Sequence, residues 1–124
     1  MKHLYRIIIA EDDRLAGKLL QMIMIGLYPL GHVSLVLNGQ EALQVYEQSG
    51  ADLMILDKNM PFIDGLELTR TLRARGVPIP IIVMSGDPAI EAEAKKAGAT
   101  LFVAKPGVYS QLPRLLPNLL VPQY

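Results

Sequence analysis

Five short apolar segments recur along the chain, and neighbouring segments are separated by enough residues for one helix. The segments are residues 5–10, 33–37, 52–56, 81–84 and 101–104, and Ile, Val and Leu are frequent in them. They lack the clean apolar–polar alternation of a strand with one face in water. Such runs are typical of parallel strands that are buried on both faces. The sequence therefore predicts an α/β protein.

The residues between these segments show the 3.6-residue period of helices. In the first of them, one predicted inward face consists of Ala16, Leu19, Leu20, Ile23 and Leu27. Helices that connect successive parallel strands make right-handed crossovers and cover both faces of the sheet. We therefore predict a doubly wound, five-stranded parallel sheet with helices on both faces.

The composition excludes several classes of function. The 124 residues contain 12 Lys and Arg against 12 Asp and Glu, and they contain no cysteine. This balance gives no strong overall field that would attract nucleic acid or an anionic membrane, which leaves only local charged patches open, and the missing cysteine excludes disulfides and thiolate metal sites. The most apolar window is too short to span a membrane. We expect residues 1–124 to form one cytoplasmic domain that binds neither nucleic acid nor membranes directly.

Polar side chains follow four of the five predicted strands. They are Glu11, Asp12 and Asp13 after the first strand, Asp57 after the third, Ser85 after the fourth and Lys105 after the fifth. In a doubly wound sheet these strand ends converge on one edge. Clustered carboxylates need a cation to remain ionised together, and Mg²⁺ prefers oxygen ligands and phosphate oxygens. A phosphoryl group at this edge would also use the lysine and the hydroxyl.

Four motifs at these strand ends, IIIAEDD, MILDKNMP…DGLEL, IIVMSGD and LFVAKPG, closely resemble the receiver domain of two-component response regulators. The resemblance covers about residues 5–107, and the order and spacing of all four motifs make it specific. It implies a flavodoxin-like (βα)5 fold. It also implies that the protein is a phosphoacceptor, which a histidine kinase or a histidine phosphotransfer protein phosphorylates. Phosphorylation would then switch partner binding, and the protein would not be a turnover enzyme.

The resemblance implies a role for each residue of the site. Asp57 corresponds to the phosphoacceptor, which becomes an acyl phosphate. The Mg²⁺ ligands correspond to Glu11, Asp12, Asp57 and the backbone carbonyl of Asn59, with Asp12 the more direct ligand of the acidic pair. Lys105 corresponds to the lysine that pairs with the phosphoryl group.

Other positions correspond to parts of the family that respond to phosphorylation. Ser85 matches the hydroxyl that contacts the phosphoryl group, and Phe102 matches the switch aromatic, although core packing explains Phe102 equally well. Because phenylalanine has no hydroxyl, a switch there would rest on packing. We hypothesise that the side chains of Asn59 and Asp87 border the path of water to Asp57 and tune dephosphorylation. We expect the Asp13 carboxylate to stabilise the start of the first helix through the helix dipole and not to bind the metal.

The first helix also presents an outward face with apolar residues. Leu15, Lys18, Met22 and Ile25 lie on or beside this face, opposite the predicted inward one. The resemblance implies that this helix docks on the partner that bears phosphohistidine. The alternative is a scatter of surface apolar side chains, which is common.

Residues 108–124 depart from the family pattern. With Ser110 as N-cap, Pro113 falls in the first turn of a fifth helix, where proline is tolerated. Pro117 would fall inside the helix and remove a hydrogen bond. We predict a short or kinked fifth helix, which weakens the case for a homodimer through the fourth helix, fifth strand and fifth helix, although a homodimer stays possible.

Two rival functions remain open. A pseudo-receiver would bind proteins without phosphate, and the complete set of strand-end residues argues against it. An aspartate-nucleophile phosphatase typically has a second Asp two residues after the nucleophile, where this chain has Asn59. The chain length leaves no room for an output domain, and its start at Met1 leads us to expect an N-terminal or free-standing receiver.

Overall fold

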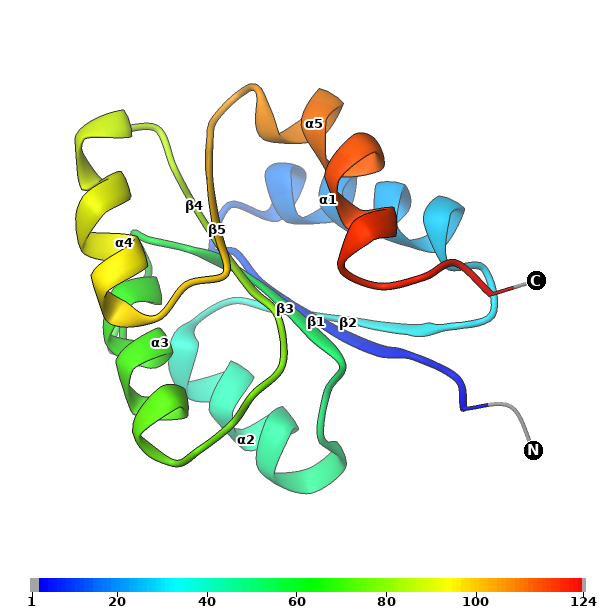
Figure 1. Ribbon diagram of the computed structural model, residues 1–124, viewed down its shortest axis with the longest axis horizontal. Helices are drawn as coiled ribbons and strands as arrows, with labels where there is room; N and C mark the ends of the chain where they lie inside the picture. Colours follow the sequence, from blue (N-terminus) through cyan, green and yellow to red (C-terminus); the bar gives the residue numbers. More distant parts are fainter. Residues whose placement is uncertain (1–2, 124) are drawn as a thin grey trace.

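A parallel sheet in the order β2-β1-β3-β4-β5 forms the centre of the protein, as a computed structural model that describes residues 3–123 shows (Figure 1). The first and last strands of this order, β2 and β5, are the edge strands, and every pair of neighbouring strands is parallel. The strands are β1 (Arg6–Ala10), β2 (His32–Val36), β3 (Leu53–Asp57), β4 (Ile81–Ser85) and β5 (Leu101–Ala104).

The helices cover both faces of the sheet, which confirms the predicted fold class. They are α1 (Arg14–Leu27), α2 (Gly39–Ser49), α3 (Gly65–Ala74), α4 (Glu91–Ala97) and α5 (Val108–Leu115), with 3-10 turns η1 (Pro88–Ile90) and η2 (Leu116–Asn118). Figure 1 shows α1 and α5 on one side of the sheet and α2, α3 and α4 on the other. Within residues 3–123, none of the helices is long and apolar enough to cross a membrane.

Two hydrophobic cores lie on opposite faces of the sheet. Ile7 and Ile9 of β1 belong to the core beneath α1 and α5, whereas Ile8 and Ala10 belong to the core beneath α2, α3 and α4. Because successive side chains of a strand point to opposite faces, a strand covered on both sides needs apolar residues throughout. This double coverage explains the uninterrupted apolar segments in the sequence.

β3 and β4 end on polar residues at one edge of the sheet. β3 continues to Asp57 and β4 to Ser85, one residue later than the sequence predicts in each case. Ala10 of β1 pairs with Leu56 of β3, and Ser85 pairs with Ala104 of β5. The carboxyl ends of these four strands therefore lie side by side.

The buried face of α1 differs from the predicted one. Gly17, Leu20 and Met24 are buried, whereas Leu19, predicted to point inward, is 43% exposed. The cause is the close approach of Leu35 on β2, because a β-carbon at Gly17 would lie 2.8 Å from its Cδ1 atom. The helix packs along a line that runs through a glycine, and a hydrophobicity pattern gives glycine no weight.

The fifth helix is short, as predicted, but it begins earlier than predicted. α5 has 8 residues and starts at Val108, so Ser110 is not its N-cap; the Ser110 hydroxyl instead donates to the Gly107 carbonyl at 3.1 Å. Pro113 therefore stands inside the helix and not in its first turn. The 3-10 turn with Pro117 follows directly, since proline cannot donate the hydrogen bond that would continue an α-helix.

Candidate functional site

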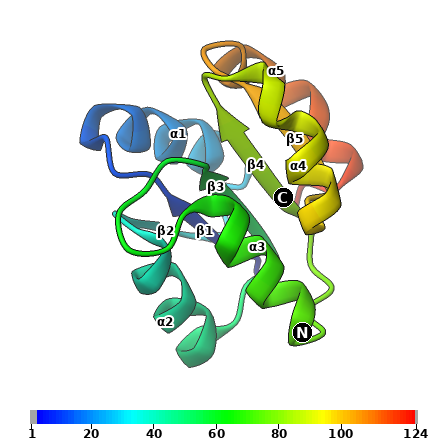
Figure 2. The ribbon, with the colours of Figure 1, turned by 90° about the vertical axis from the view of Figure 1, so that its left-hand side faces the viewer.

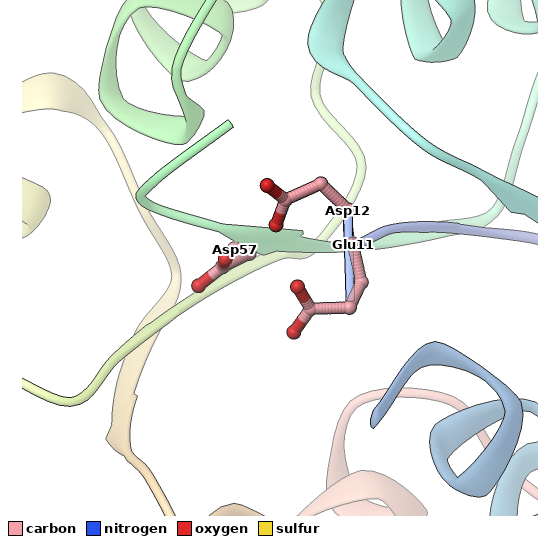
Figure 3. Close-up of side chains that lie close together, drawn as sticks. All are labelled: Glu11, Asp12 and Asp57. Atoms are coloured by element: carbon pink, nitrogen blue, oxygen red, sulfur yellow. The ribbon is translucent and has the colours of Figure 1, made fainter. Parts of the chain in front are cut away.

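Three carboxylates gather at the edge where β1 and β3 end (Figure 3). Glu11 and Asp12 follow β1 and Asp57 ends β3, and each offers an oxygen within 4.8 Å of the other two. The side chains of Glu11 and Asp57 are 1% and 8% exposed, whereas Asp12 is exposed. The cluster is therefore open to solvent on the side of Asp12.

Hydrogen bonds fix the acidic segment that follows β1. The Glu11 amide donates to the Val36 carbonyl at 3.0 Å, which extends the pairing of β1 with β2. The Asp13 amide donates to Glu11 Oε2 at 3.1 Å, and the Asp13 carboxylate accepts from the amides of Leu15 and Ala16. Asp13 is therefore the N-cap of α1, in agreement with its expected service to the helix start.

Lys105 reaches into the carboxylate cluster from the end of β5. Its Nζ donates to Glu11 Oε1 at 2.5 Å and lies 3.2 Å from Asp57 Oδ1. Burial lowers the pKa of Lys105, but the hydrogen bond to Glu11 and the charges of both carboxylates outweigh burial, so the pKa is raised. The side chain is therefore cationic at neutral pH. The following Lys105–Pro106 peptide bond is cis.

The donors in this pocket suit a hard divalent cation. One ammonium stands among three carboxylates, so negative charge remains in excess, and neighbouring carboxylates oppose one another's ionisation unless a cation is near. Glu11, Asp12 and Asp57 offer only oxygen ligands, which is the donor set that Mg²⁺ takes. The predicted carbonyl ligand, Asn59, is an exposed residue two positions after Asp57.

Gly65, at the start of α3, packs on the backbone of Asp57. A β-carbon at Gly65 would lie 2.5 Å from the Asp57 carbonyl oxygen. The Gly65 amide donates to the Lys58 carbonyl at 3.0 Å, and the Lys58 amide donates to the Met84 carbonyl at 2.8 Å. The two ends of the loop of residues 58–64 are therefore joined by a hydrogen bond beside the end of β3, while the rest of the loop between β3 and α3 bows outward (Figure 2). The sequence pair Asp-Gly indicates a turn and a helix start, but it does not indicate this contact.

Ser85 ends β4 next to Lys105. It is buried, its Oγ accepts from the Asp87 amide at 3.0 Å, and its carbonyl accepts from the Lys105 amide at 2.9 Å. The hydroxyl hydrogen of Ser85 can still be donated. Asp87 is exposed and its carboxylate accepts from the Ala89 amide at 3.0 Å, so it caps η1.

Phe102 lies within β5 and away from the strand end. It pairs with Val83 of β4 and packs, half-buried, against the core beneath α2, α3 and α4. The site thus brings together the predicted acids and Lys105, with Ser85 on the neighbouring strand, while Phe102 stands apart. Its switching role stays a prediction.

A comparison with protein families agrees with this geometry. The family described as "Response regulator receiver domain" matches residues 7–116. The chain belongs to this family. The receiver motifs in the sequence and the strand-end cluster in the structure thus lead to the same assignment.

Curated relatives of this receiver are longer proteins. The response regulator MprA of Mycolicibacterium vanbaalenii is 33% identical over 110 residues, which are 86% of this chain and 46% of the relative. The protein-glutamate methylesterase/protein-glutamine glutaminase of Treponema denticola is 29% identical over 105 residues, which are 82% of this chain and 28% of the relative. The receiver therefore spans less than half of the length of either relative.

Solved structures share the fold of this receiver. The receiver domain of a sensor histidine kinase from Pseudomonas aeruginosa PAO1 has a TM-score of 0.81 at 26% identity over 94% of this chain and 98% of that one, and its crystal structure has a magnesium ion coordinated in the active site cleft. The chemotaxis response regulator CheY4 of Vibrio cholerae has a TM-score of 0.84 at 23% identity over 95% of this chain and 100% of that one. The second likeness supports the fold alone.

The outward face of α1 is apolar and accessible. Leu15, Met22 and Ile25 are 83%, 63% and 50% exposed, and Lys18 between them is exposed as well. Their exposure agrees with the outward placement expected from the sequence. Docking of a partner on this face of the receiver stays a prediction.

Proposed function

We propose that this receiver takes a phosphoryl group from the phosphohistidine of a histidine kinase or a histidine phosphotransfer protein onto Asp57. The observation that carries the proposal is the meeting of Glu11, Asp12 and Asp57 within 4.8 Å, with Lys105 Nζ 3.2 Å from Asp57 Oδ1. A pseudo-receiver would have no use for this costly gathering of like charges. The chain then acts as a phosphorylated signalling protein and not as a turnover enzyme.

Mg²⁺ is the cofactor we propose for this step. Glu11, Asp12 and Asp57 would hold it, together with the carbonyl of Asn59, and the bound ion would neutralise charge on the phosphoryl oxygens. The donor set supports this choice, because all of these ligands are oxygens. The magnesium ion in the Pseudomonas receiver structure is consistent with the same choice.

The proposed transfer exchanges one phosphorus bond for another. A carboxylate oxygen of Asp57 attacks the phosphorus, and the bond from phosphorus to the donor imidazole nitrogen breaks. The bonding electrons return to that nitrogen, and the imidazole leaves neutral because its other nitrogen keeps a proton. Lys105, cationic at neutral pH, offsets the repulsion between the two anionic reactants. The products are an acyl phosphate on Asp57 and a free histidine.

Residues around the pocket would respond to phosphorylated Asp57 and set how long the acyl phosphate lasts. Ser85 can donate its hydroxyl hydrogen to a phosphoryl oxygen while its Oγ keeps the Asp87 amide, and Phe102 would follow by repacking to switch partner binding. Exposed Asn59 and Asp87 would tune the access of water to the acyl phosphate. We propose that the kinase docks on Leu15, Lys18, Met22 and Ile25 of α1. The reaction would take place in the cytoplasm. Homodimerisation is one form that the response to phosphorylation could take.

Acetyl phosphate provides the test. With Mg²⁺, the unsubstituted chain should acquire one acid-stable, base-labile phosphoryl group, and Asp57→Asn or removal of Mg²⁺ by EDTA should abolish it. No labelling would contradict the proposal and favour the pseudo-receiver. Steady turnover of many phosphate esters would contradict it in favour of a phosphatase.

A further inference from the structure

Phe62, in the loop after β3, has an unusual backbone conformation. Its φ is 70°, and among residues 3–123 it is the only residue other than glycine with a positive φ. The Ile63 amide donates to the Pro61 carbonyl at 2.9 Å, which closes a three-residue γ-turn centred on Phe62. The form of this turn with positive φ is the rare and strained one, and a bulky side chain is poorly suited to it.

The Phe62 side chain does not recover this strain by packing. It is 79% exposed, second only to Leu15 at 83% among the exposed large apolar residues of the part that the structure describes. Glycine would adopt this backbone without strain and would forfeit little burial. The stability of the fold therefore does not explain a phenylalanine here. Strained residues of this kind cluster at functional loops.

The loop holds the Phe62 ring outward. Met60 is only 9% exposed and packs in the core, and the Asp64 side chain caps α3. Ile63 lies so close to Gly39 that no β-carbon would fit between them. With these anchors on both sides, the tip of the loop presents Phe62 at a defined place on the surface.

Phe62 and Leu15 stand on segments that leave neighbouring strands. Phe62 follows Asp57 by five residues and Leu15 follows Asp12 by three, and β1 pairs directly with β3. Both segments start from the edge of the sheet at which β1 and β3 end (Figure 2), and the carboxylates drawn in Figure 3 lie at this edge. Because the Asp57 side chain is only 8% exposed, a protein that delivers a histidine to it has to press its own surface on this border.

We propose that Phe62, together with Leu15, forms an apolar rim on which the protein phosphodonor docks when it phosphorylates Asp57. The inference rests on the proposed function. The partner that fits the rim has apolar side chains around its phosphohistidine, because burial of an exposed ring against apolar atoms is favourable. A small donor such as acetyl phosphate has no surface to place there. Phe62 is thus a docking residue that takes no part in the chemistry.

The test compares two donors on Phe62→Gly and Phe62→Ala. One is acetyl phosphate, and the other is whichever phosphorylated histidine kinase or phosphotransfer protein of the same genome labels the unsubstituted chain fastest. We expect the KM for the protein donor to rise about tenfold or more, with kcat within about twofold. The rate with acetyl phosphate should change by less than about twofold. Val121→Ala, which shortens a side chain 68% exposed in the C-terminal segment, should change neither rate.

Each outcome decides for or against the inference. An unchanged KM for the protein donor would overturn it and leave the proposed function intact. A parallel loss of acetyl phosphate labelling would also overturn it, because Phe62 would then support the pocket itself. Acetyl phosphate labelling with no labelling by any protein donor overturns it as well, whereas no labelling of the unsubstituted chain by either route overturns the proposed function. Phe62→Gly should be at least as stable to urea as Phe62→Ala, since glycine relieves the strain.

Discussion

The ammonium of Lys105 joins Asp57 to Glu11, with Nζ 3.2 Å from Asp57 Oδ1 and hydrogen-bonded to Glu11 Oε1. Both carboxylates are nearly buried, so Lys105 offsets the repulsion between them. In the proposed reaction the same ammonium would turn to the arriving phosphoryl group. One side chain therefore serves the resting fold and the chemistry.

Replacement of Lys105 should destabilise the resting protein. Lys105→Met leaves Glu11 and Asp57 without their cation, and we expect the free energy of unfolding to fall by about 1–3 kcal/mol. Lys95→Met is the control, because Lys95 pairs with Glu91 at 3.5 Å on the exposed surface of α4, and it should change stability by at most about 0.5 kcal/mol. Urea denaturation in EDTA measures both variants. Equal effects would contradict a structural role for Lys105.

Metal affinity should distinguish two adjacent acids. Asp12→Asn removes a ligand of the cluster, and we expect it to weaken Mg²⁺ binding about tenfold or more. Asp13→Asn removes the next charge along the chain but keeps a good N-cap for α1, so its Mg²⁺ affinity should stay close to that of the unsubstituted chain. Isothermal titration calorimetry measures both. Equal losses would mean that net charge, and not ligation, governs the binding.

Replacing glycine with alanine should destabilise the protein at Gly65, where the new β-carbon has no room, but not at Gly26, where it has. A β-carbon at Gly65 would meet the Asp57 carbonyl oxygen at 2.5 Å, so Gly65→Ala should lower stability by about 1–3 kcal/mol and slow labelling by acetyl phosphate. Gly26, inside α1, has open space at the same atom, and Gly26→Ala should raise stability by about 0.5–1 kcal/mol. Urea denaturation compares the two, and a neutral Gly65→Ala would argue against the close packing.

Tyr28 should make the protein sensitive to alkali. Its hydroxyl donates to the Leu120 carbonyl at 2.6 Å. The pKa of Tyr28 is raised to about 12, mainly by burial and to a smaller extent by the neighbouring Tyr5. An unfolded tyrosine ionises near about pH 10. Between these two values the unfolded state binds fewer protons, so stability is complete below about pH 10 and declines as pH rises towards about 12.

Tyr28→Phe isolates this contribution. We expect it to cost about 1 kcal/mol at neutral pH through the lost hydrogen bond. The difference between the two proteins should then shrink as the pH rises above about 10, because phenylalanine has no proton to lose. Urea denaturation at neutral pH and at about pH 11 measures the change. A difference that is the same at both pH values would contradict a raised pKa for Tyr28.

The strand ends could be predicted from the sequence because apolar runs and polar tips differ in composition. The structure extends β3 and β4 to Asp57 and Ser85 themselves, a shift of one residue that leaves the convergence of the tips unchanged. Local patterns could not show the pairing of Lys105 with Glu11, because those residues are 94 positions apart. That contact depends on the order of the strands in the sheet.

The features of the structure that the sequence does not predict all depend on backbone geometry. Gly17 lets α1 approach Leu35, Gly65 lets α3 approach Asp57, and neither contact leaves a mark in hydrophobicity. The positive φ of Phe62 is also absent from the sequence pattern, since a bulky residue is not expected there. The sequence correctly predicts a short fifth helix, but it places the start of that helix at the wrong residue. In the structure the amides of Ser110 and Gln111 donate to the Gly107 carbonyl, so the helix begins earlier and without a serine N-cap.

The residue that carries the phosphoryl group tests directly whether Asp57 is the phosphoacceptor. After reaction with acetyl phosphate and Mg²⁺, borohydride reduction converts an aspartyl phosphate to homoserine, and tandem mass spectrometry of the peptides locates that residue. We expect homoserine at position 57 alone, and none without acetyl phosphate. Modification at Asp12, at Ser85 or at any other residue, with Asp57 unmodified, would contradict it.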